Sequence, residues 1–329
     1  MTAIAPRSIL VIQLRRIGDV ILSTPALAAL QRRYPGARID ILVERPAAEV
    51  VSGCKDLNET LIYEASGVPS ALRWILRIRE RRYDLVVDFM GNPRTAILTA
   101  FSGAALRAGP AHVFHRWAYN VRLPQSTQTV YAAREKIRML APLGVPDEPL
   151  ALPSVEAWRS RRSPGNRVGF FPASRKLTRQ WPAEHFARLG QKLRDAYGCE
   201  IVVFWGDGDR GAAERVVNGI GGAATLSAAT ATLHALASQM SACRLVVSNC
   251  AGPKHVAVAA GIPTLTIHGS SDPKAWTPES PLHAAVRRDE LHCIGCRLND
   301  CPYALECLRD LSVERVFTAA SKLLDRVPA

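Results

Sequence analysis

Long apolar runs are missing from this sequence of 329 residues, and so is an export signal. No stretch approaches the ~18 to 20 uninterrupted apolar residues that a membrane-spanning helix requires. The N-terminus has no charged segment followed by an apolar stretch and a small-residue cleavage site. A P-loop and the recognition motifs of nucleic-acid-binding proteins are also absent. We therefore expect a soluble, cytoplasmic protein that is not an NTPase and binds no nucleic acid.

Acidic residues are few relative to basic ones, above all in the first half. The net charge is +13, and residues 1–165 hold 23 Lys and Arg against 14 Asp and Glu. One predicted helix there carries Arg73, Arg77 and Arg81 beside Trp74, which suits a phosphate-rich partner or an anionic membrane surface. A solvated, arginine-rich surface is the alternative.

Strand-like and helical patterns alternate along the first half of the chain. Apolar runs at 8–14, 38–43 and 84–89 predict strands, and the patterns at 19–33 and 70–82 predict helices. This βαβαβ order is typical of a parallel sheet that is covered on both faces.

The second half repeats this alternation. Its predicted strands lie at 167–172, 200–206, 244–249 and 263–269, and its predicted helices at 182–197, 208–219, 232–241 and 253–260. The proline- and charge-rich stretch 145–166 predicts the connection between an N-terminal domain, 1–150, and a C-terminal domain, 151–329. We expect two doubly wound α/β domains that face each other and bind ligands beyond the carboxyl ends of their strands.

The loop 172–182 is rich in groups that bind phosphate. It carries Ser174, Arg175, Lys176 and Arg179 before a Trp-Pro pair that opens a helix. Hydroxyl and guanidinium groups beside a helix N-terminus favour a pyrophosphate. Arginines that are merely solvated are the alternative.

The loop 248–261 runs through Ala251 and Gly252 into a helix whose first turn holds Lys254 and His255. Small residues there let a ligand approach the unpaired N–H groups. A lysine at a helix start opposes the helix dipole, which indicates an anion nearby. For His255, local packing is the alternative.

Two further loops follow strands of the second half. The loop 205–211, WGDGDRG, either contacts the ribose or base of a nucleotide or is an ordinary turn. The loop 268–278 is interpreted mainly as a structural connection.

Four cysteines gather in the segment CIGCRLNDCPYALEC, at Cys293, Cys296, Cys301 and Cys307. Four thiolates can complete a tetrahedral shell, and a C-x2-C pair is the usual first half of such a site. The spacing predicts a structural zinc or iron site. Reduced thiols or two disulfides are the alternatives.

A single carboxylate, Asp19, lies in the segment RRIGDVILSTPAL between a predicted buried strand and an apolar helix. It can serve as a general base, and Arg15 and Arg16 would then attract a phosphorylated acceptor and help to keep it ionised. It can also cap the first turn of the helix.

Four segments, in order, resemble glycosyltransferase family 9, the ADP-heptose:lipopolysaccharide heptosyltransferases. They are ILVIQLRRIGDVILSTPAL, RYDLVVDFMGNPRTAILTAFSGAALRAG, RQWPAEHFARL and AGPKHVAVAAGIPTLTIHGSSDPKAWTP. The resemblance implies a GT-B fold with two Rossmann-like domains across a cleft, the acceptor on the N-terminal one and the donor on the C-terminal one. It also implies an inverting transfer from ADP-heptose to inner-core lipopolysaccharide or a related glycan, without a catalytic metal. The basic excess of the N-terminal half predicts that this half lies against the cytoplasmic face of the inner membrane.

The resemblance also assigns roles to single residues. Asp19 matches the family's general base. The donor-binding positions are Ser174, Arg175, Arg179, Ala251, Gly252 and His255. The chain departs from the family pattern at Cys250 and Ala251, where an aspartate and a hydroxyl residue are usual. A non-catalytic nucleotide-sugar or glycan-binding protein and a heptosyltransferase with a protein acceptor therefore remain as alternatives.

Overall fold

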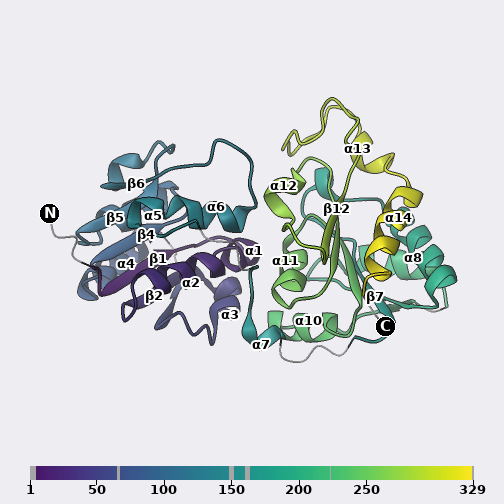
Figure 1. The fold of residues 1–329 in the computed structure, drawn as a ribbon, viewed down its shortest axis with the longest axis horizontal. Coiled ribbons are helices and arrows are strands. Elements are labelled where there is room, and N and C mark those ends of the chain that lie inside the picture. The colour runs from purple at the N-terminus through teal and green to yellow at the C-terminus, as the bar shows by residue number, and fades with distance from the viewer. Residues whose placement is uncertain (1–4, 65–66, 148–151, 160–163, 223, 328–329) are drawn as a thin grey trace. The chain divides into compact units, whose positions relative to one another are not determined.

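The computed structural model describes residues 5–64, 67–147, 152–159, 164–222 and 224–327. It divides into two compact units, Met1–Val155 and Glu156–Ala329, each built on one six-stranded parallel sheet (Figure 1). Within the described residues, no helix combines the length and the apolarity needed to cross a membrane.

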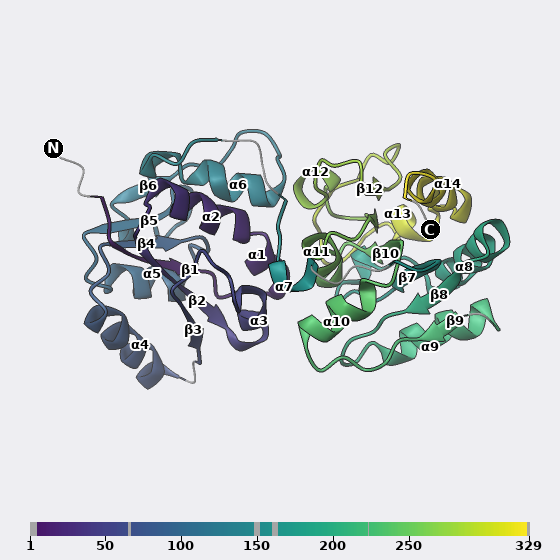
Figure 2. The same ribbon diagram turned by 60° about the horizontal axis from the view of Figure 1, so that its bottom comes forward.

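The sheet of the N-terminal unit has the order β3-β2-β1-β4-β5-β6. Its strands are β1 (Ser8–Ile12), β2 (Arg38–Glu44), β3 (Glu59–Tyr63), β4 (Leu85–Asp88), β5 (Leu106–Pro110) and β6 (Val121–Leu123). The main helices are α1 (Ile17–Ile21), α2 (Thr24–Arg33), α3 (Ala48–Val51), α4 (Val68–Glu80), α5 (Pro93–Ala100) and α6 (Ala132–Met139). Helices α2 and α6 pack together on one face of the sheet, and α4 and α5 cover the other (Figure 2).

The C-terminal unit repeats this topology with the order β9-β8-β7-β10-β11-β12. Its strands are β7 (Arg167–Phe171), β8 (Glu200–Val203), β9 (Ala224–Leu226), β10 (Leu245–Asn249), β11 (Thr264–Ile267) and β12 (His283–Val286). The helices are α7 (Glu156–Arg159), α8 (Ala183–Tyr197), α9 (Arg210–Ile220), α10 (Leu233–Met240), α11 (Gly252–Ala259), α12 (Pro273–Trp276), α13 (Glu306–Arg309) and α14 (Val313–Leu324).

Each sheet has a point where the strand order reverses. The reversal falls between β1 and β4 in one unit and between β7 and β10 in the other. Helices on either side of such a point leave in opposite directions, so a crevice opens beyond the carboxyl ends of these strands. The loops after β1, β4, β7 and β10 are therefore the places to look for a ligand site.

Two predicted features of the N-terminal unit are wrong. The pattern at 19–33 forms two helices, because α2 starts afresh at Thr24 with Pro25 in its first turn, where a proline is tolerated. Trp74, expected as an exposed aromatic on an arginine-rich helix, is only 6% exposed and packs against Tyr63. Arg81 also faces inward enough to pair with Glu59, at 2.5 Å.

Candidate functional site

Asp19 lies in the first turn of α1, directly after β1 at the reversal point of the N-terminal sheet. The N-cap position belongs to Arg16, and no side chain caps this helix. Arg16 has φ 42°, a left-handed conformation that is uncommon outside glycine. The carboxylate of Asp19 is partly buried and accepts no hydrogen bond from a described residue in our structure. The capping interpretation of Asp19 is therefore wrong.

Among the described residues, the charges that shift the pKa of Asp19 are positive. Burial raises the pKa of its carboxyl group, and the charges of Lys136, Arg16 and Arg15 oppose that rise. Arg15 and Arg16 are exposed, whereas Lys136 is partly buried. The positive charges limit the rise in the pKa of Asp19, and no hydrogen bond from a described residue occupies its carboxylate, which suits a general base.

Lys136 is a member of this site that the sequence predictions missed. It lies on α6, and its Nζ donates to Oε1 of Gln13 at 2.5 Å and sits 4.7 Å from the centre of the Phe89 ring. Burial lowers the pKa of Lys136 to about 8, against the opposing effect of the charges of Asp19 and Asp88. No motif includes this residue, so only the packing of α6 on the sheet reveals it.

Asp88, at the end of β4, is fully buried and has a structural role. Its carboxylate accepts the N–H groups of Met90 at 2.7 Å and Gly91 at 3.2 Å, and the hydroxyl of Tyr119 at 2.7 Å. These bonds shape the turn after β4 beside Lys136. Because its oxygens already accept three hydrogen bonds, Asp88 is unsuited to act as the base.

In the C-terminal unit, the loops after β7 and β10 are tied together by Asn249. Its Oδ1 accepts the N–H of Trp181 at 3.0 Å, and its Nδ2 donates to the carbonyl of Pro172 at 2.5 Å. This brings the two predicted phosphate-binding loops, 172–182 and 248–261, to the same end of the sheet. Both loops therefore flank the reversal point.

The predicted residues of the first loop differ in their surroundings. Arg175 is exposed, and Oγ of Ser174 accepts the N–H of Lys176 at 3.4 Å. Arg179 is partly buried, and its Nε is shielded from solvent without a hydrogen-bond partner in the described structure. A buried guanidinium donor without a partner costs free energy, which favours an anionic ligand beside Arg179.

The second loop opens α11. The N–H of Ala251, predicted as a donor to a pyrophosphate, instead donates to the carbonyl of Asn249 at 2.7 Å. Gly252 is the first residue of the helix, and a Cβ placed on it would meet nothing within 4 Å. The space above this helix start is therefore open, and Gly252 is the better backbone donor.

Two buried side chains of α11, Lys254 and His255, complete this end of the sheet. Lys254 is 1% exposed and donates to the carbonyl of Trp276 at 2.5 Å. Burial and the charge of Lys254 hold the pKa of His255 well below its usual range, so His255 is neutral. Its Nδ1 is buried without a hydrogen-bond partner among the described residues.

The remaining two loops differ in what they add. The loop 268–278, predicted to be mainly architecture, supplies Trp276 to the site, and its His268 bonds to Ser271 at 2.9 Å and Thr277 at 3.0 Å. In the loop 205–211, the Arg210 guanidinium lies 5.4 Å from the Trp205 ring centre. The segment also has the spacing G-x-G-x-x-G, from the loop after β8 into α9, a signal that the sequence predictions missed.

Cys293, Cys296 and Cys301 lie in the long loop between β12 and α13, and Cys307 lies in α13, at the margin of the C-terminal unit (Figure 1). Burial and the nearby thiols of the other three cysteines, Cys293, Cys296 and Cys301, raise the pKa of Cys307 to about 11. All four thiols are free, and within the described chain no group of three or more His, Cys, Asp or Glu is arranged to hold a metal ion. As placed, the cysteines do not form a coordination shell.

Two pockets of the C-terminal unit lie away from these loops. One is lined by residues of α8 and α14 that include Lys192 and Glu314, and the other by Arg167 and Glu200 at the starts of β7 and β8. The first is away from the carboxyl ends of the strands, whereas the second runs along β8 and β9 as far as Phe204 and Ser227, which follow these strands.

Two sheets of the same strand order, each with charged loops at its reversal point, define the GT-B class of two-domain α/β proteins. The family model "Glycosyltransferase family 9 (heptosyltransferase)" matches residues 71–305, and the chain belongs to this family. The protein is therefore a glycosyltransferase.

Similar proteins cover most of the chain. Lipopolysaccharide heptosyltransferase 1 of Pseudomonas aeruginosa is 25% identical over 90% of this chain and 87% of its own length. Lipopolysaccharide heptosyltransferase 2 of Escherichia coli is 24% identical over 85% and 87%. The crystal structure of a family 9 glycosyltransferase from Veillonella parvula matches with a TM-score of 0.81 and 25% identity, over 97% of both chains.

Proposed function

We propose that the protein is an inverting glycosyltransferase that moves heptose, or a related sugar, from ADP-heptose to the inner core of lipopolysaccharide or a related glycan. The names of its relatives support the substrates: they include lipopolysaccharide heptosyltransferases, and one solved relative is E. coli heptosyltransferase WaaC with ADP-2-deoxy-2-fluoro heptose. The observation that carries the mechanism is the carboxylate of Asp19, which lies at a sheet reversal point. It forms no capping hydrogen bond, and the charges of Lys136, Arg16 and Arg15 act on it.

Asp19 acts as the general base in this mechanism. It takes the proton of the acceptor hydroxyl while that oxygen forms a bond to the anomeric carbon of the sugar. The bond from this carbon to the diphosphate breaks on the opposite face, and its electron pair leaves with the ADP. The single step inverts the anomeric configuration and needs only one protein carboxylate.

The C-terminal unit holds the donor in this proposal. Arg179 and Arg175 offer guanidinium groups to the diphosphate, Ser174 offers a hydroxyl, and Gly252 offers an N–H at the start of α11. Neutral His255 has a free Nδ1 with which to bond the donor. Positive charge around the departing diphosphate stabilises the negative charge that develops there in the transition state.

The N-terminal unit receives the acceptor. Arg15 and Arg16 are exposed beside Asp19 and suit the phosphate or carboxylate groups of an anionic glycolipid. Such an acceptor would place the protein on the cytoplasmic face of the inner membrane, as a peripheral protein.

A structural zinc or iron ion at the four cysteines is a separate part of the proposal. Its support is the spacing of Cys293, Cys296, Cys301 and Cys307, which begins with the C-x2-C pair that is usual in four-thiolate sites. Solved relatives include TibC, whose structure is described as that of an iron-containing dodecameric glycosyltransferase and is 15% identical. Protein purified without chelator should carry about one equivalent of metal; less than roughly a tenth contradicts this part.

The test of the mechanism is Asp19→Asn, assayed with ADP-heptose and heptose-free lipopolysaccharide. We expect kcat to fall roughly 10²- to 10⁴-fold, because asparagine cannot accept the proton, with ADP affinity nearly unchanged. The readouts are ADP release and the mass of the acceptor. Since Asp19 makes no capping bond, the melting temperature should stay close to that of the wild type.

The matched control is Asp56→Asn, which removes another carboxylate of the same unit and should leave turnover intact. If Asp19→Asn keeps more than about a tenth of wild-type turnover, Asp19 is not the base. ADP-heptose binding without any ADP release from the wild type would instead identify a non-catalytic binding protein. Transfer to a protein but not to the glycolipid would identify a protein-acceptor enzyme.

A further inference from the structure

Two large aromatic side chains point into solvent from one short loop of the N-terminal unit. The loop spans residues 111–120 between β5 and β6, the edge strand of the sheet, and we call it the edge loop. Phe114 is 89% exposed and Trp117 is 59% exposed. Burying such a side chain is worth about 1.5 to 3 kcal/mol, so two exposed aromatics within one loop indicate a surface that meets a partner.

The base of the edge loop is well anchored, so the exposure of its aromatics is not a failure to pack. Ala118 and Tyr119 are buried, and the hydroxyl of Tyr119 donates to Asp88 at 2.7 Å. Nε of Arg107 donates to the carbonyl of Ala118 at 3.2 Å, and Nδ2 of Asn120 donates to the carbonyl of Ala105 at 2.7 Å. The loop therefore holds Phe114 and Trp117 outward on a fixed base.

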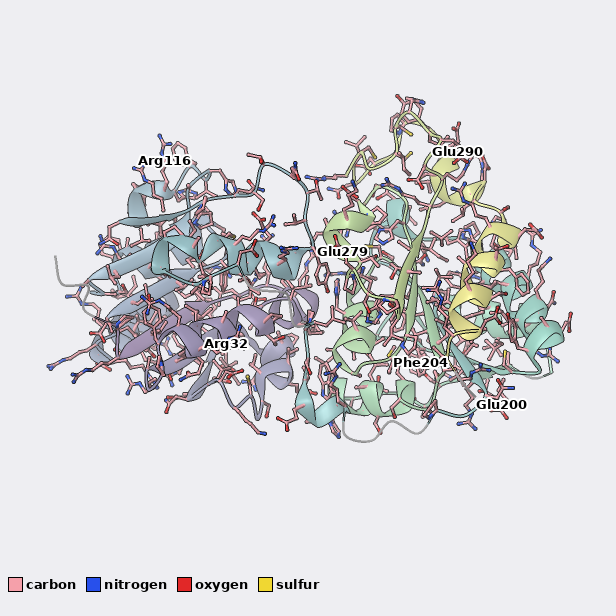
Figure 3. All side chains as sticks on the ribbon, in the orientation of Figure 1. Arg32, Arg116, Glu200, Phe204, Glu279 and Glu290 are labelled. Atoms are coloured by element: carbon pink, nitrogen blue, oxygen red, sulfur yellow. The ribbon has the colours of Figure 1, made fainter. Side chains whose placement is uncertain are left out.

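The charge around these aromatics is of one sign. No Asp or Glu occurs in the sequence between Asp88 and Glu135. Arg116 and Arg122 are exposed, and neither forms an ion pair with a carboxylate in the described part of the chain. Figure 3 shows Arg116 at the outer margin of the N-terminal unit. The edge loop is thus an aromatic and cationic surface.

We propose that the edge loop docks on an anionic lipid surface, with Phe114 and Trp117 in the interfacial layer and the guanidinium groups of Arg116 and Arg122 on lipid phosphates. Tryptophan favours the membrane interface because its ring is apolar and its N–H is polar. Each arginine near such a surface adds about 1 kcal/mol of attraction. The inference rests on the proposed function, since a glycolipid acceptor gives docking its purpose.

This surface differs from the arginine-rich helix expected from the sequence. On α4, Trp74 is buried, and the exposed apolar residues are Leu72, at 58%, and Leu76, at 52%. Exposed Arg73 and Arg77 flank this leucine pair. The pair thus offers a control of similar exposure and charge that carries no aromatic ring.

The experiment is sedimentation of the full chain with vesicles of phosphatidylcholine, with and without phosphatidylglycerol. We expect the wild type to bind only the anionic vesicles, with an affinity that falls steeply with salt. Phe114→Ser/Trp117→Ser and Arg116→Gln/Arg122→Gln should each weaken binding roughly tenfold or more, whereas Leu72→Ser/Leu76→Ser should change it less than about twofold. Melting curves confirm that the variants are folded.

Three results would overturn the docking proposal. In the first, Phe114→Ser/Trp117→Ser binds anionic vesicles as tightly as the wild type does. In the second, Leu72→Ser/Leu76→Ser loses as much affinity as the aromatic variant. In the third, the wild type binds neutral vesicles as tightly as anionic ones. A change of oligomeric state in the aromatic variant, seen by light scattering, would assign the surface to a second copy of the chain instead.

A transfer assay with a soluble acceptor oligosaccharide distinguishes failure of the docking proposal from failure of the proposed function. The aromatic variant should turn this acceptor over as the wild type does, because Phe114 and Trp117 are exposed side chains and Tyr119, which bonds to Asp88, is left in place. If the wild type transfers no sugar at all but shows the expected vesicle binding, the proposed function fails and docking stands. If it transfers sugar but does not bind anionic vesicles, docking alone fails.

Discussion

Replacing Lys136 tests whether its charge sets the ionisation of Asp19. Burial raises the pKa of Asp19, and Lys136 is the largest opposing influence. An opposite charge at close range lowers the pKa of a carboxyl group by about 1 to 3 units, and partial exposure places this pair at the lower end. Lys136→Gln should therefore raise the pKa of Asp19 further.

The sign of the effect on activity follows directly. A general base acts only when deprotonated, so a higher pKa of Asp19 moves the acid limb of the kcat/KM profile to higher pH. At pH values below the pKa of Asp19, kcat/KM of Lys136→Gln should be about tenfold lower than that of the wild type. Well above this pKa, the two kcat/KM values should converge. Lys136→Arg keeps the charge and should leave the acid limb in place.

The assay is the pH dependence of kcat/KM, which reports groups of the free enzyme. Arg138→Gln is the matched control, because Arg138 lies on the same helix but pairs with Asp147 at 3.0 Å. A profile of Lys136→Gln that superposes on that of the wild type would refute the reasoning, and so would an equal shift in Arg138→Gln. In Asp19→Asn, the pKa of Lys136 should fall below about 8, because the neighbouring negative charge is lost.

Two further predictions concern the C-terminal unit and the core. Arg179→Ala should weaken ADP binding roughly 10- to 100-fold in calorimetry, since a charge-assisted hydrogen bond contributes about 1.5 to 3 kcal/mol. Cys250→Ala should change ADP affinity less than about threefold. Equal losses of affinity in the two variants would contradict the donor site proposed here. Tyr83→Phe should lower the free energy of unfolding by about 1.5 to 3 kcal/mol, because its hydroxyl donates at 2.6 Å to the fully buried Asp40. In the same urea titration, Tyr303→Phe at an exposed position should change it by less than about 0.5 kcal/mol.

The sequence revealed the elements with strong local patterns. Strands β1, β4, β7, β8, β10 and β11 lie within predicted apolar runs, and β2 extends one residue beyond its predicted run, to Glu44. Strands β3, β5, β6, β9 and β12 and helix α14 were not predicted. Several of these are short or partly exposed, and β9 has only three residues with no buried position. Such strands form because a neighbour offers hydrogen bonds, and a single-sequence pattern does not show that neighbour.

What the sequence determined by itself is the class of fold and the loops that carry the chemistry. Alternating periodicities dictate parallel sheets with helices on both faces, and residues such as Asp19 and Arg179 adjoin recognisable strand ends. Only the tertiary structure decided which other groups surround them. Lys136 reaches Gln13 from a helix that follows five more strands, Asn249 joins two loops far apart in the chain, and Trp74 turns inward. Burial and charge act through space, so their effects on each side chain are fixed only when distant segments pack together.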